Sequence, residues 1–385
     1  MSWSQIRLGD IAIFRNGINF GKESYGKGVS LIGVSDFKNR FYPDYETLDE
    51  VKESVVGVND YLDYGDIVFV RSNGNKELVG RCMLINTTKP KVTYSGFCIR
   101  TRIKDSTEHD SIFWTYHFKN ISFRKAMSGN AIGTNIQNLS QGMLSNYEAE
   151  VPDYNTQRRI ASILSTYDDL IENNQKQIKL LEEAAQRLYK EWFIDLRFPG
   201  HENVEVVDGV PEGWNIGILG DIGTFKRGKT ITKAKIVEGE VPVISGGLGP
   251  AYYHNESNTS SPVITVSGSG ANAGFTRLYY TKVFASDCSF VDIEQTPYLY
   301  WIYLFLKNNS SRLDMLQKGS AQPHVYAKDI NALECIIPMK EILNLFCELV
   351  SLYFDIIGIL DKQIIRLTEA RDRLLPKLMS GEIEV

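Results

Sequence analysis

The sequence has few of the residues with which proteins build metal and redox sites. Its five cysteines form no C-x-x-C pair, and its five histidines are scattered without an H-E-x-x-H arrangement. This pattern argues against a zinc or disulfide framework and predicts reduced, mostly buried thiols in a cytoplasmic protein. A Walker lysine loop, a G-x-S-x-G elbow and an Asp/Asn-Pro-Pro-Tyr/Phe loop that would hold a flipped adenine are also missing. These absences favour a binding protein over an enzyme.

Long uncharged apolar runs and an excess of positive charge are missing too. The most apolar window, 342–360, contains Glu348 and Asp355, and the first ten residues lack the apolar stretch of a secretory signal. Both observations argue against export and against a membrane span. The net charge is −5 and the pI about 5.7, whereas a nucleic-acid binder usually carries a basic face. Binding to DNA would therefore need local basic clusters or help from partner chains.

Two stretches of the sequence occur twice. Residues 3–17 recur as 214–228 with 7 of 15 positions identical, and residues 176–189 recur as 362–375 with 8 of 14 identical. The order along the chain is therefore a globular unit, a helix, a second globular unit and a second helix. A two-fold repeat of this kind indicates a target or partner that is itself two-fold.

The globular parts are expected to be α+β folds with a large share of strands. In residues 1–151, short β-type runs at 11–14, 29–34, 66–70 and 81–85 alternate with Gly-, Asn- and Asp-rich connections, and 112–125 is predicted to be a helix. Residues 202–337 repeat this style, with strands at 241–245, 262–267, 274–280 and 282–285 and a helix at 298–318. The segments that follow the two globular parts, 152–201 and 338–385, are predicted to be long helices.

Both long helices carry an apolar seam with 3-4 spacing, which buries best against another helix. Thr156 is the expected N-cap of the first helix, Pro376 should end or kink the second, and a two-fold relation requires the helices to lie antiparallel. The polar exceptions in the seams are Asn174 and Arg371, which could fix the register. The predicted seam consists of Leu164, Ile171, Asn174, Ile178, Leu181, Leu188, Ile357, Leu360, Ile364, Leu367 and Leu374.

Three polar loops are candidates for ligand contacts. The loop 71–76 after the strand 66–70 contains Arg and Asn, which can read guanine and adenine edges, although a solvated hairpin tip is the alternative. The loop 224–230 places three cations beside Gly228, which suits phosphate, although a solvated turn is the alternative. The segment 267–274 matches G-x-G-x-x-A, but a dinucleotide or S-adenosylmethionine site needs a helix to follow, and the sequence after it is β-like. We therefore expect no cofactor there.

The order and duplication of these features resemble the specificity subunits of type I restriction–modification enzymes. Leu8-Gly-Asp-Ile and Leu219-Gly-Asp-Ile look like the openings of the two target-recognition domains, and Phe69-Val-Arg-Ser-Asn-Gly is similar to a recurrent loop in the first domain. Val266-Ser-Gly-Ser-Gly-Ala-Asn resembles the counterpart in the second. The segments 152–164 and 374–381 look like the helix opening and the chain end. The resemblance covers nearly the whole chain.

The resemblance implies a non-catalytic subunit with two recognition domains (1–151 and 202–337) joined by two antiparallel spacer helices (152–201 and 338–385). Each domain would read one half of a bipartite double-stranded DNA target. Two methyltransferase subunits would dock on the helices and bind S-adenosylmethionine, and a motor-nuclease subunit would bring ATP and Mg²⁺. The chain itself would hold no cofactor or metal.

The residues expected to contact DNA come from both domains. They are Arg15, Asn16, Arg71, Ser72, Asn73, Asn75, Lys76 and Asn135 in the first domain, and Lys226, Arg227, Lys229, Ser267, Ser269, Asn272, Arg277, Gln322 and His324 in the second. Two other functions stay open from the residues alone. One is an autonomous DNA methyltransferase, against which the missing catalytic loop argues. The other is a structural coiled-coil adaptor without DNA affinity, which would not need two domains with polar Arg/Asn loops.

Overall fold

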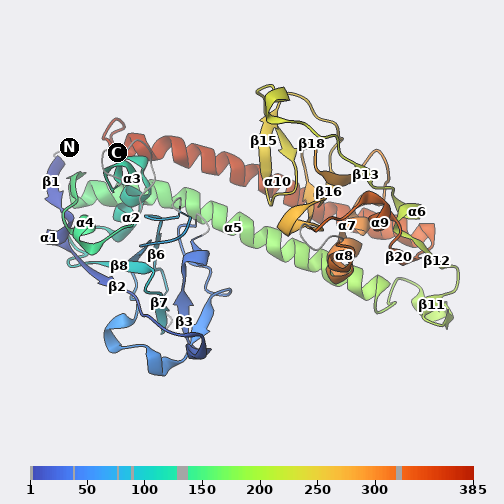
Figure 1. The fold of residues 1–385 in the computed structure, drawn as a ribbon, viewed down its shortest axis with the longest axis horizontal. Coiled ribbons are helices and arrows are strands. Elements are labelled where there is room, and N and C mark those ends of the chain that lie inside the picture. The colour runs from blue at the N-terminus through green and yellow to red at the C-terminus, as the bar shows by residue number, and fades with distance from the viewer. Residues whose placement is uncertain (1–2, 38–39, 76–77, 88–90, 128–137, 318–322) are drawn as a thin grey trace. The chain divides into compact units, whose positions relative to one another are not determined.

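The computed structural model describes the 385 residues except 1–2, 38–39, 76–77, 88–90, 128–137 and 318–322. Two compact units make up the chain. Unit 1 combines Met1–Asn173 with Gln363–Val385, and unit 2 is Asn174–Lys362. Two 40-residue helices, α5 (Tyr154–Phe193) and α10 (Lys340–Met379), each contribute one end to unit 1 and the other to unit 2 (Figure 1).

Unit 1 is built on short strands from distant parts of the sequence. Its central sheet is antiparallel, with the order β2 (Ala12–Asn16), β8 (Cys98–Ile103), β5 (Ile67–Val70), β6 (Cys82–Leu84). A mixed sheet has the order β4 (Asp49–Val51), β3 (Tyr25–Ile32), β7 (Val92–Tyr94), and β1 (Trp3–Arg7) pairs with β9 (Glu148–Pro152). The short helices are α1 (Leu8–Ile11), α2 (Ser111–Lys119), α3 (Ile121–Met127) and α4 (Gln141–Ser145).

Unit 2 repeats this topology strand for strand. Its central sheet has the order β13 (Lys226–Arg227), β19 (Cys288–Asp292), β16 (Val263–Ser267), β17 (Thr276–Tyr279). The mixed sheet is β15 (Pro250–His254), β14 (Val241–Ile244), β18 (Phe284–Ala285), and β12 (Asn215–Ile218) pairs with β20 (Glu334–Ile337). A hairpin of β10 (Val206–Val207) and β11 (Val210–Pro211) precedes them, and the short helices are α6 (Leu219–Ile222), α7 (Leu299–Asn308), α8 (Ser310–Met315) and α9 (Ala327–Asn331). The internal repeat is therefore a repeat of fold as well as of sequence, which confirms the predicted α+β architecture.

The two helices predicted inside the globular parts are each broken in two. The prediction of one helix over 112–125 is wrong because α2 ends at Lys119 and α3 begins at Ile121. Asn120 lies between them with extended dihedral angles, and its side-chain oxygen accepts a hydrogen bond from the Ser122 amide at 3.3 Å. The predicted helix 298–318 also breaks at an asparagine, Asn309, between α7 and α8; there the side-chain amide donates to the Phe305 carbonyl at 2.9 Å. Since Asn favours such caps over helix interiors, each Asn ends one helix and starts the next.

Within each unit the long helices run antiparallel, as predicted. In unit 1 an ion pair joins Asp168 of α5 to Arg371 of α10, and in unit 2 the rings of Trp192 and Phe346 lie 5.5 Å apart. Five of the predicted seam residues are buried: Leu164, Ile171, Asn174, Ile357 and Leu360. Four are partly buried and pack against a core, Ile178, Leu181 and Leu188 in unit 2 and Leu374 in unit 1. The remaining two, Ile364 and Leu367, are half-buried.

The ends of the long helices differ from the sequence prediction. Thr156 is not the N-cap of α5 but lies in its first turn, where the carboxylate of Asp153 accepts hydrogen bonds from its amide at 3.2 Å and its hydroxyl at 2.9 Å. Asp153 therefore satisfies the helix start. Pro376 does not end α10, which continues to Met379.

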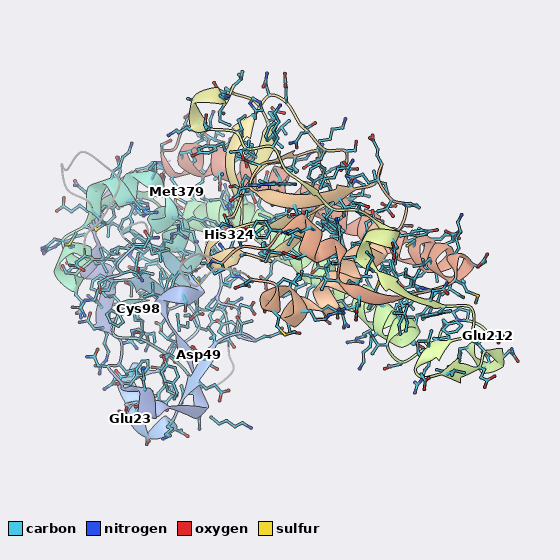
Figure 2. The ribbon with its side chains drawn as sticks, turned by 45° about the vertical axis from the view of Figure 1, so that its right-hand side comes forward. Glu23, Asp49, Cys98, Glu212, His324 and Met379 are labelled. Carbon is cyan, nitrogen blue, oxygen red and sulfur yellow. The ribbon has the colours of Figure 1, made fainter. Side chains whose placement is uncertain are left out.

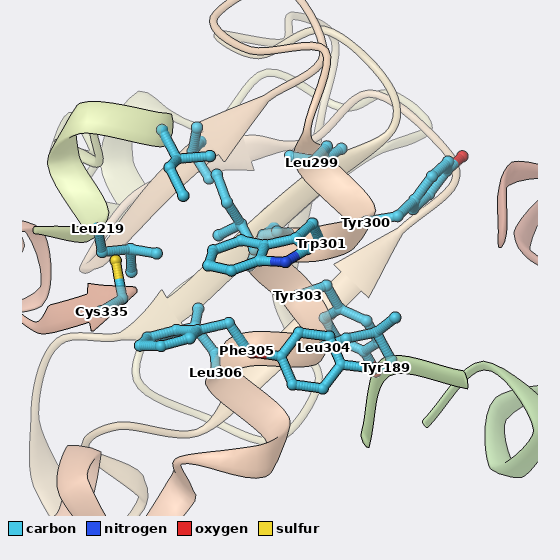
Figure 3. Close-up of a cluster of buried hydrophobic side chains, with 14 of the residues drawn as sticks. Tyr189, Leu219, Leu299, Tyr300, Trp301, Tyr303, Leu304, Phe305, Leu306 and Cys335 are labelled. Carbon is cyan, nitrogen blue, oxygen red and sulfur yellow. The ribbon is translucent and has the colours of Figure 1, made fainter. Parts of the chain in front are cut away.

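The cores are apolar and rich in aromatic rings. The core of unit 2 joins Trp301 and Phe305 of α7 to Tyr189 of α5, with Leu219 and Cys335 on the far side (Figure 3). All five cysteines are buried and free, as expected. Burial raises the pKa of Cys82 to about 11 and that of Cys288 to about 12, so these thiols are poor nucleophiles.

Helix α10 is long and apolar enough to cross a membrane when only length and composition are considered. Its most apolar stretch has a mean hydropathy of 1.8, and 39% of that stretch is buried. Core helices of soluble proteins pass the same test, so this is weak evidence. Phe346, Val350, Phe354 and Ile357 of α10 belong to the core of unit 2.

Candidate nucleic-acid interface

The same group of loops closes one edge of the central sheet in both units. In unit 1 these loops follow β2, follow β5 and connect β7 to β8; in unit 2 they follow β13, follow β16 and connect β18 to β19. The amide of Gly17 donates to the Cys98 carbonyl at 3.2 Å, and the amide of Gly228 donates to the Cys288 carbonyl at 2.8 Å. We call these loops, with the segments that bond to them, the edge of unit 1 and the edge of unit 2. In Figure 2 the edges are marked by Cys98, which follows the β7–β8 loop, and by His324, which forms a β-bridge with Ser269.

Further equivalent contacts hold each edge together. The Leu139 amide donates to the Arg71 carbonyl at 2.9 Å, and the Val325 amide donates to the Gly268 carbonyl at 3.1 Å. A Cβ on Gly17 would overlap the carbonyl oxygen of Tyr94, and one on Gly228 that of Ala285. Glycine is thus required at the same point of both edges by a close backbone approach. The loop closure is fixed by the backbone, which leaves the side chains on the edge variable.

The edge of unit 1 surrounds a cavity of about 860 Å³. Ser72 and Asn73 of the predicted Arg/Asn loop line this cavity. Residues that the sequence prediction missed line it as well, among them Asn19, Tyr25 and Phe97. Tyr25 is 47% exposed and Phe97 62% exposed. Exposed aromatic rings beside amide and hydroxyl groups form a surface suited to base edges and thymine methyl groups.

The Arg/Asn loop is held by its own hydrogen bonds. The Asn73 side-chain oxygen accepts the Asn75 amide at 2.7 Å, which makes an Asx turn. Arg71 is exposed, and its guanidinium donates to the Gly96 carbonyl at 3.3 Å. The loop therefore presents Arg71 next to Phe97, whose carbonyl accepts the Arg71 amide at 2.8 Å.

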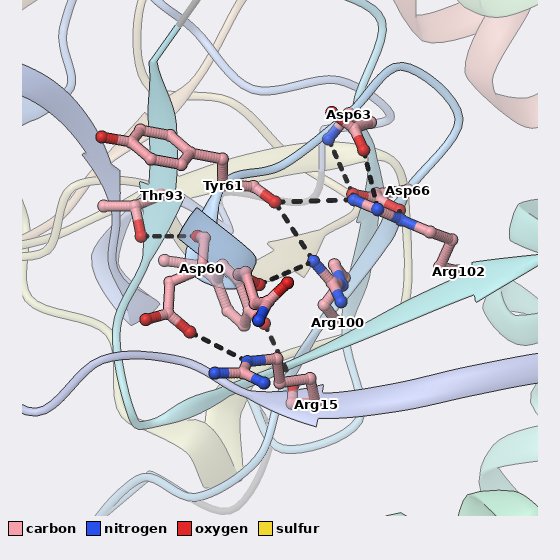
Figure 4. Close-up of polar contacts among 10 residues, drawn as sticks. Arg15, Asp60, Tyr61, Asp63, Asp66, Thr93, Arg100 and Arg102 are labelled. Atoms are coloured by element: carbon pink, nitrogen blue, oxygen red, sulfur yellow. Dashed lines mark hydrogen bonds and ion pairs between the residues drawn. The ribbon is translucent and has the colours of Figure 1, made fainter. Parts of the chain in front are cut away.

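Several basic residues of unit 1 have structural partners instead of a free surface (Figure 4). The predicted contact residue Arg15 pairs with Asp60 at 2.9 Å. Arg102 pairs with Asp66 at 2.6 Å and with Asp63 at 2.7 Å, and Asp66 is 1% exposed. Together with Arg100, which donates to the Tyr61 carbonyl at 3.1 Å, they hold the segment 59–66 against the sheet. Asn16 is exposed at the end of β2.

The cavity at the edge of unit 2 is smaller than the one in unit 1. Arg227, Gly268, Asp287, His324 and Tyr326 line a cavity of about 190 Å³. Ser269 donates a hydrogen bond to Asp287, and Ser269 forms a β-bridge with His324, whose ring stacks on that of Tyr326 at 6.0 Å. The structure therefore brings together Arg227, Ser269 and His324 of the predicted set and adds Asp287 and Tyr326.

Other predicted residues of unit 2 lie elsewhere. Lys226 faces away from Arg227 and lines a different cavity with Asn258 and Asp292, because successive residues of a strand point to opposite faces. The three cations around Gly228 thus do not all converge, and Lys229 is exposed beyond β13. Asn272 donates to the Gly246 carbonyl at 3.4 Å.

Of two further predicted residues, one is buried and the other is exposed but contacts its own unit. Ser267 is 4% exposed, so its hydroxyl is not at the surface. Arg277 lies on β17, where its guanidinium donates to the Leu248 carbonyl at 3.1 Å and lies 5.0 Å from the centre of the Tyr279 ring. The predicted residues Lys76, Asn135 and Gln322 lie outside the described residues.

The glycine-rich segment of unit 2 has the β context that the sequence predicts. Strand β17 follows it, with only a short 3-10 turn at Gly270–Asn272 between. In the part of the chain that the structure describes, no group of three or more His, Cys, Asp or Glu side chains could hold a metal ion.

The missed edge residues left only a weak signal in the sequence. Phe97 and Asp287 each stand directly before a cysteine, Cys98 or Cys288, and these cysteines occupy the same place in β8 and β19. An alignment of the two halves on these cysteines would have pointed to both loops. The strands β8 and β19 themselves were not predicted, since neither alternates polar and apolar residues.

Comparison with known proteins agrees with the doubled fold. Residues 2–183 and 211–372 match the family described as type I restriction modification DNA specificity domain. The chain is 30% identical over 329 residues to the type I restriction enzyme MjaIX specificity subunit of Methanocaldococcus jannaschii, covering 77% of this chain and 74% of that protein. It is 24% identical to the type I restriction enzyme HindI specificity subunit of Haemophilus influenzae, covering 99% of both.

A solved structure shares the fold across the whole chain. The type I restriction–modification system S subunit from M. genitalium superposes with a TM-score of 0.60 at 20% identity, covering 98% of this chain and 96% of that one. With the family match over both repeats, the chain belongs to the family of type I restriction–modification specificity subunits.

Proposed function

We propose that this chain is the non-catalytic DNA-recognition subunit of a type I restriction–modification complex, in which each unit reads one half of a bipartite, asymmetric DNA target. The observation that carries this is the pair of edges. Equivalent backbone hydrogen bonds close the two edges, while different sets of side chains line their cavities. One scaffold that displays two different sets of side chains suits two different half-sites.

The side chains on the edges fit the chemistry of base recognition. On the edge of unit 1, Arg71 can donate to guanine O6 and N7, and Phe97 can contact a thymine methyl group. On the edge of unit 2, Arg227 can donate to guanine or phosphate, and Asp287 can accept from cytosine N4. A substitution on one edge should change recognition of one half-site only.

The complex would need other subunits for its chemistry. Two methyltransferase subunits would dock on the helices and supply S-adenosylmethionine, and a motor-nuclease subunit would supply ATP and Mg²⁺ in the cytoplasm. Partner chains that enclose the DNA would also offset the net charge of −5, since phosphate contacts need cations.

Mapping of methylated adenines tests the proposal. The chain would be co-expressed with its methyltransferase in a host without that modification, and the genome sequenced by a method that detects N6-methyladenine. We expect one bipartite motif, and we expect Arg71→Ala to relax only one half of it. Relaxation of both halves by this single change would contradict the division of labour.

Two measurements separate the proposal from its alternatives. An autonomous methyltransferase would bind S-adenosylmethionine, so micromolar affinity of the isolated chain in calorimetry would overturn the non-catalytic role. A structural adaptor would give no retardation of DNA in gels when the methyltransferase is present.

The helices would act as the ruler between half-sites. Insertion of four residues between Gln175 and Lys176 in the middle of α5 adds about 6 Å at ~1.5 Å per residue, or roughly two base pairs at ~3.4 Å each. Four residues change the phase of the seam by only ~40°, whereas two change it by ~200°. We expect a motif with the same halves and a longer gap from the first variant and loss of assembly from the second. If the four-residue variant assembles but methylates only sites with the original spacing, the partner subunits set the gap.

A further inference from the structure

Helix α10 carries an exposed apolar stripe within unit 2. Leu345, Leu349, Leu352, Ile356 and Ile359 are 39 to 61% exposed, and their spacing alternates four and three residues. This is the heptad spacing of a helix–helix seam. We call these five residues the α10 stripe. The opposite face of the same helix packs into the core of unit 2, so the stripe is a second apolar face.

A row of carboxylates runs along one side of the α10 stripe. Glu341, Glu348 and Asp355 follow each other at intervals of seven residues, and all three are exposed. In the part of the chain that the structure describes, none of them joins a salt bridge. At 3.6 residues per turn they lie along one margin of the stripe. An apolar seam with charged margins is the pattern that selects a partner helix by its complementary charge.

The carboxylate row argues against two of the possible occupants. In an antiparallel pair of two copies the same margins of the helices face each other, which would set Glu341, Glu348 and Asp355 against their own copies and repel. An anionic lipid surface would be repelled in the same way. The surface instead suits an amphipathic helix of a different chain, with its own heptad seam and a row of Lys or Arg on the facing margin.

The equivalent stretch of α5, in unit 1, lacks this surface. Residues 186 positions before the α10 stripe are Arg159, Ile163, Thr166, Leu170 and Asn173, of which only Ile163 and Leu170 are apolar, at 36% and 45% exposed. The positions that match the carboxylate row are residues 155, 162 and 169, with a single acidic residue, Asp169. The repeat therefore offers two docking surfaces of unequal apolar area.

We propose that the α10 stripe is the high-affinity docking surface for a basic-margined helix of one methyltransferase subunit, and that the α5 counterpart binds a second copy more weakly. This rests on the proposed function, since it takes the methyltransferase as the partner. Assembly is then ordered: a 1:1 complex forms first through unit 2, and the second subunit adds at higher concentration. Three fewer apolar side chains at the α5 surface make the second step weaker by at least about tenfold.

Titration of the full chain with its methyltransferase subunit, followed by native mass spectrometry and analytical ultracentrifugation, tests the order. We expect a 1:1 species over at least a tenfold range of concentration before the 2:1 species appears. Leu352→Glu should weaken the first step more than a hundredfold and leave the second, whereas the matched variant Leu170→Glu should abolish the second step and leave the first. The double change Glu348→Gln with Asp355→Asn should weaken the first step several-fold at low salt and less at high salt.

Loss of binding at the α10 stripe can be told apart from loss of folding. Because Leu352 is 61% exposed, its replacement should leave the melting curve unchanged, and Leu352→Ala provides a milder second variant. Two equal binding steps, or a first step that survives Leu352→Glu, would overturn the inference and leave the proposed function standing. Self-association of the purified chain that Leu352→Glu removes, or binding to vesicles through the stripe, would identify a different occupant and also overturn it. Failure of the wild-type chain to bind the methyltransferase at all would instead refute the proposed function.

Discussion

The two units solve the same packing problem with opposite chemistry. Phe113-Trp-Thr-Tyr116-His-Phe in α2 matches Tyr300-Trp-Ile-Tyr303-Leu-Phe in α7. In unit 1 the hydroxyl of Tyr116 donates to Asp168 at 2.5 Å, and Asp168 is paired with Arg371. In unit 2 the positions of the long helices that match Asp168 and Arg371, 186 residues away, hold Phe354 and Ala185.

Aromatic packing replaces the charged contact in unit 2. The ring of Phe354 stacks on Tyr300 at 4.5 Å with an interplanar angle of 10°, and meets Tyr303 edge-on at 5.8 Å. Replacing a buried ion pair by apolar groups of similar volume is often neutral or stabilising, whereas removal of one charge partner is costly. Unit 1 therefore depends on a complete polar network, while unit 2 depends on packed apolar area.

The largest effect is expected from Arg371→Ala. It leaves the carboxylate of Asp168, which is 8% exposed, without its cation, and should destabilise unit 1 by about 3–5 kcal/mol. Hydrogen exchange followed by mass spectrometry reads α2 and α7 separately and should show faster exchange in α2 only. Arg373→Ala, an exposed residue on the same helix, is the matched control. An equal loss of protection in α7 would show that the network is shared by both units.

Acid should destabilise unit 1 more than unit 2 through His117. Burial lowers the pKa of His117 to about 4 from 6.5, and the matching residue in unit 2 is Leu304, which does not titrate. Since the unfolded chain binds the proton at higher pH, the stability of unit 1 is complete above pH 6.5 and is lost as the pH falls towards 4, by about 3 kcal/mol in all. His117→Leu should remove this part of the pH dependence. The measurement is denaturant unfolding of the wild type and the variant between pH 7 and 4. If the free energy of unfolding depends on pH equally in both proteins, the assignment to His117 is wrong.

Removal of the hydroxyl should destabilise the protein more at Tyr116 than at Tyr303. Tyr116→Phe removes a hydrogen bond to a buried carboxylate, and we expect a loss of about 1.5–3 kcal/mol. Tyr303→Phe keeps the ring that meets Phe354, so its effect should stay within about 0.5 kcal/mol. Unfolding by urea, monitored by exchange in α2 and α7, would compare the two variants. Equal effects would mean that Tyr303 relies on its hydroxyl as much as Tyr116 does.

The sequence allowed prediction of the repeat, the fold class and the long helices because these depend on period and order. Heptad spacing over forty residues is a strong signal of a long helix. The doubled Leu-Gly-Asp-Ile stretch marks the equivalent point near the start of each repeat. The sequence did not allow prediction of strand β8 in unit 1 or of its counterpart β19 in unit 2, because both are largely buried and lack alternation. The partner of Arg371 was likewise missed, since Asp168 comes from the other helix, 203 residues away.

The candidate interface was predicted in part. The Arg/Asn loop of unit 1 lies on the edge, because polar residues after a strand end at the sheet margin. Arg15 has a structural ion pair and Lys226 lies on the other face of its strand, which composition alone does not reveal. Phe97 and Asp287 were missed because one aromatic or acidic residue in a loop has no period.

The smallest effect is expected from a substitution of Phe97 on the edge of unit 1. Phe97 is exposed on the edge of unit 1, and its counterpart region in unit 2 carries Asp287 held by Ser269. Phe97→Ala should leave folding unchanged and weaken DNA binding by about 1 kcal/mol, the value of one apolar contact with a base. Because the contact is apolar, the loss should not depend on salt, whereas the loss in Arg227→Ala should shrink as salt rises. Fluorescence anisotropy with the assembled methyltransferase, at two salt concentrations and with each half-site scrambled in turn, measures this. If Phe97→Ala weakens binding equally when the half-site of unit 1 is scrambled, Phe97 does not read that half-site, and the aromatic cavity serves only to hold the loop.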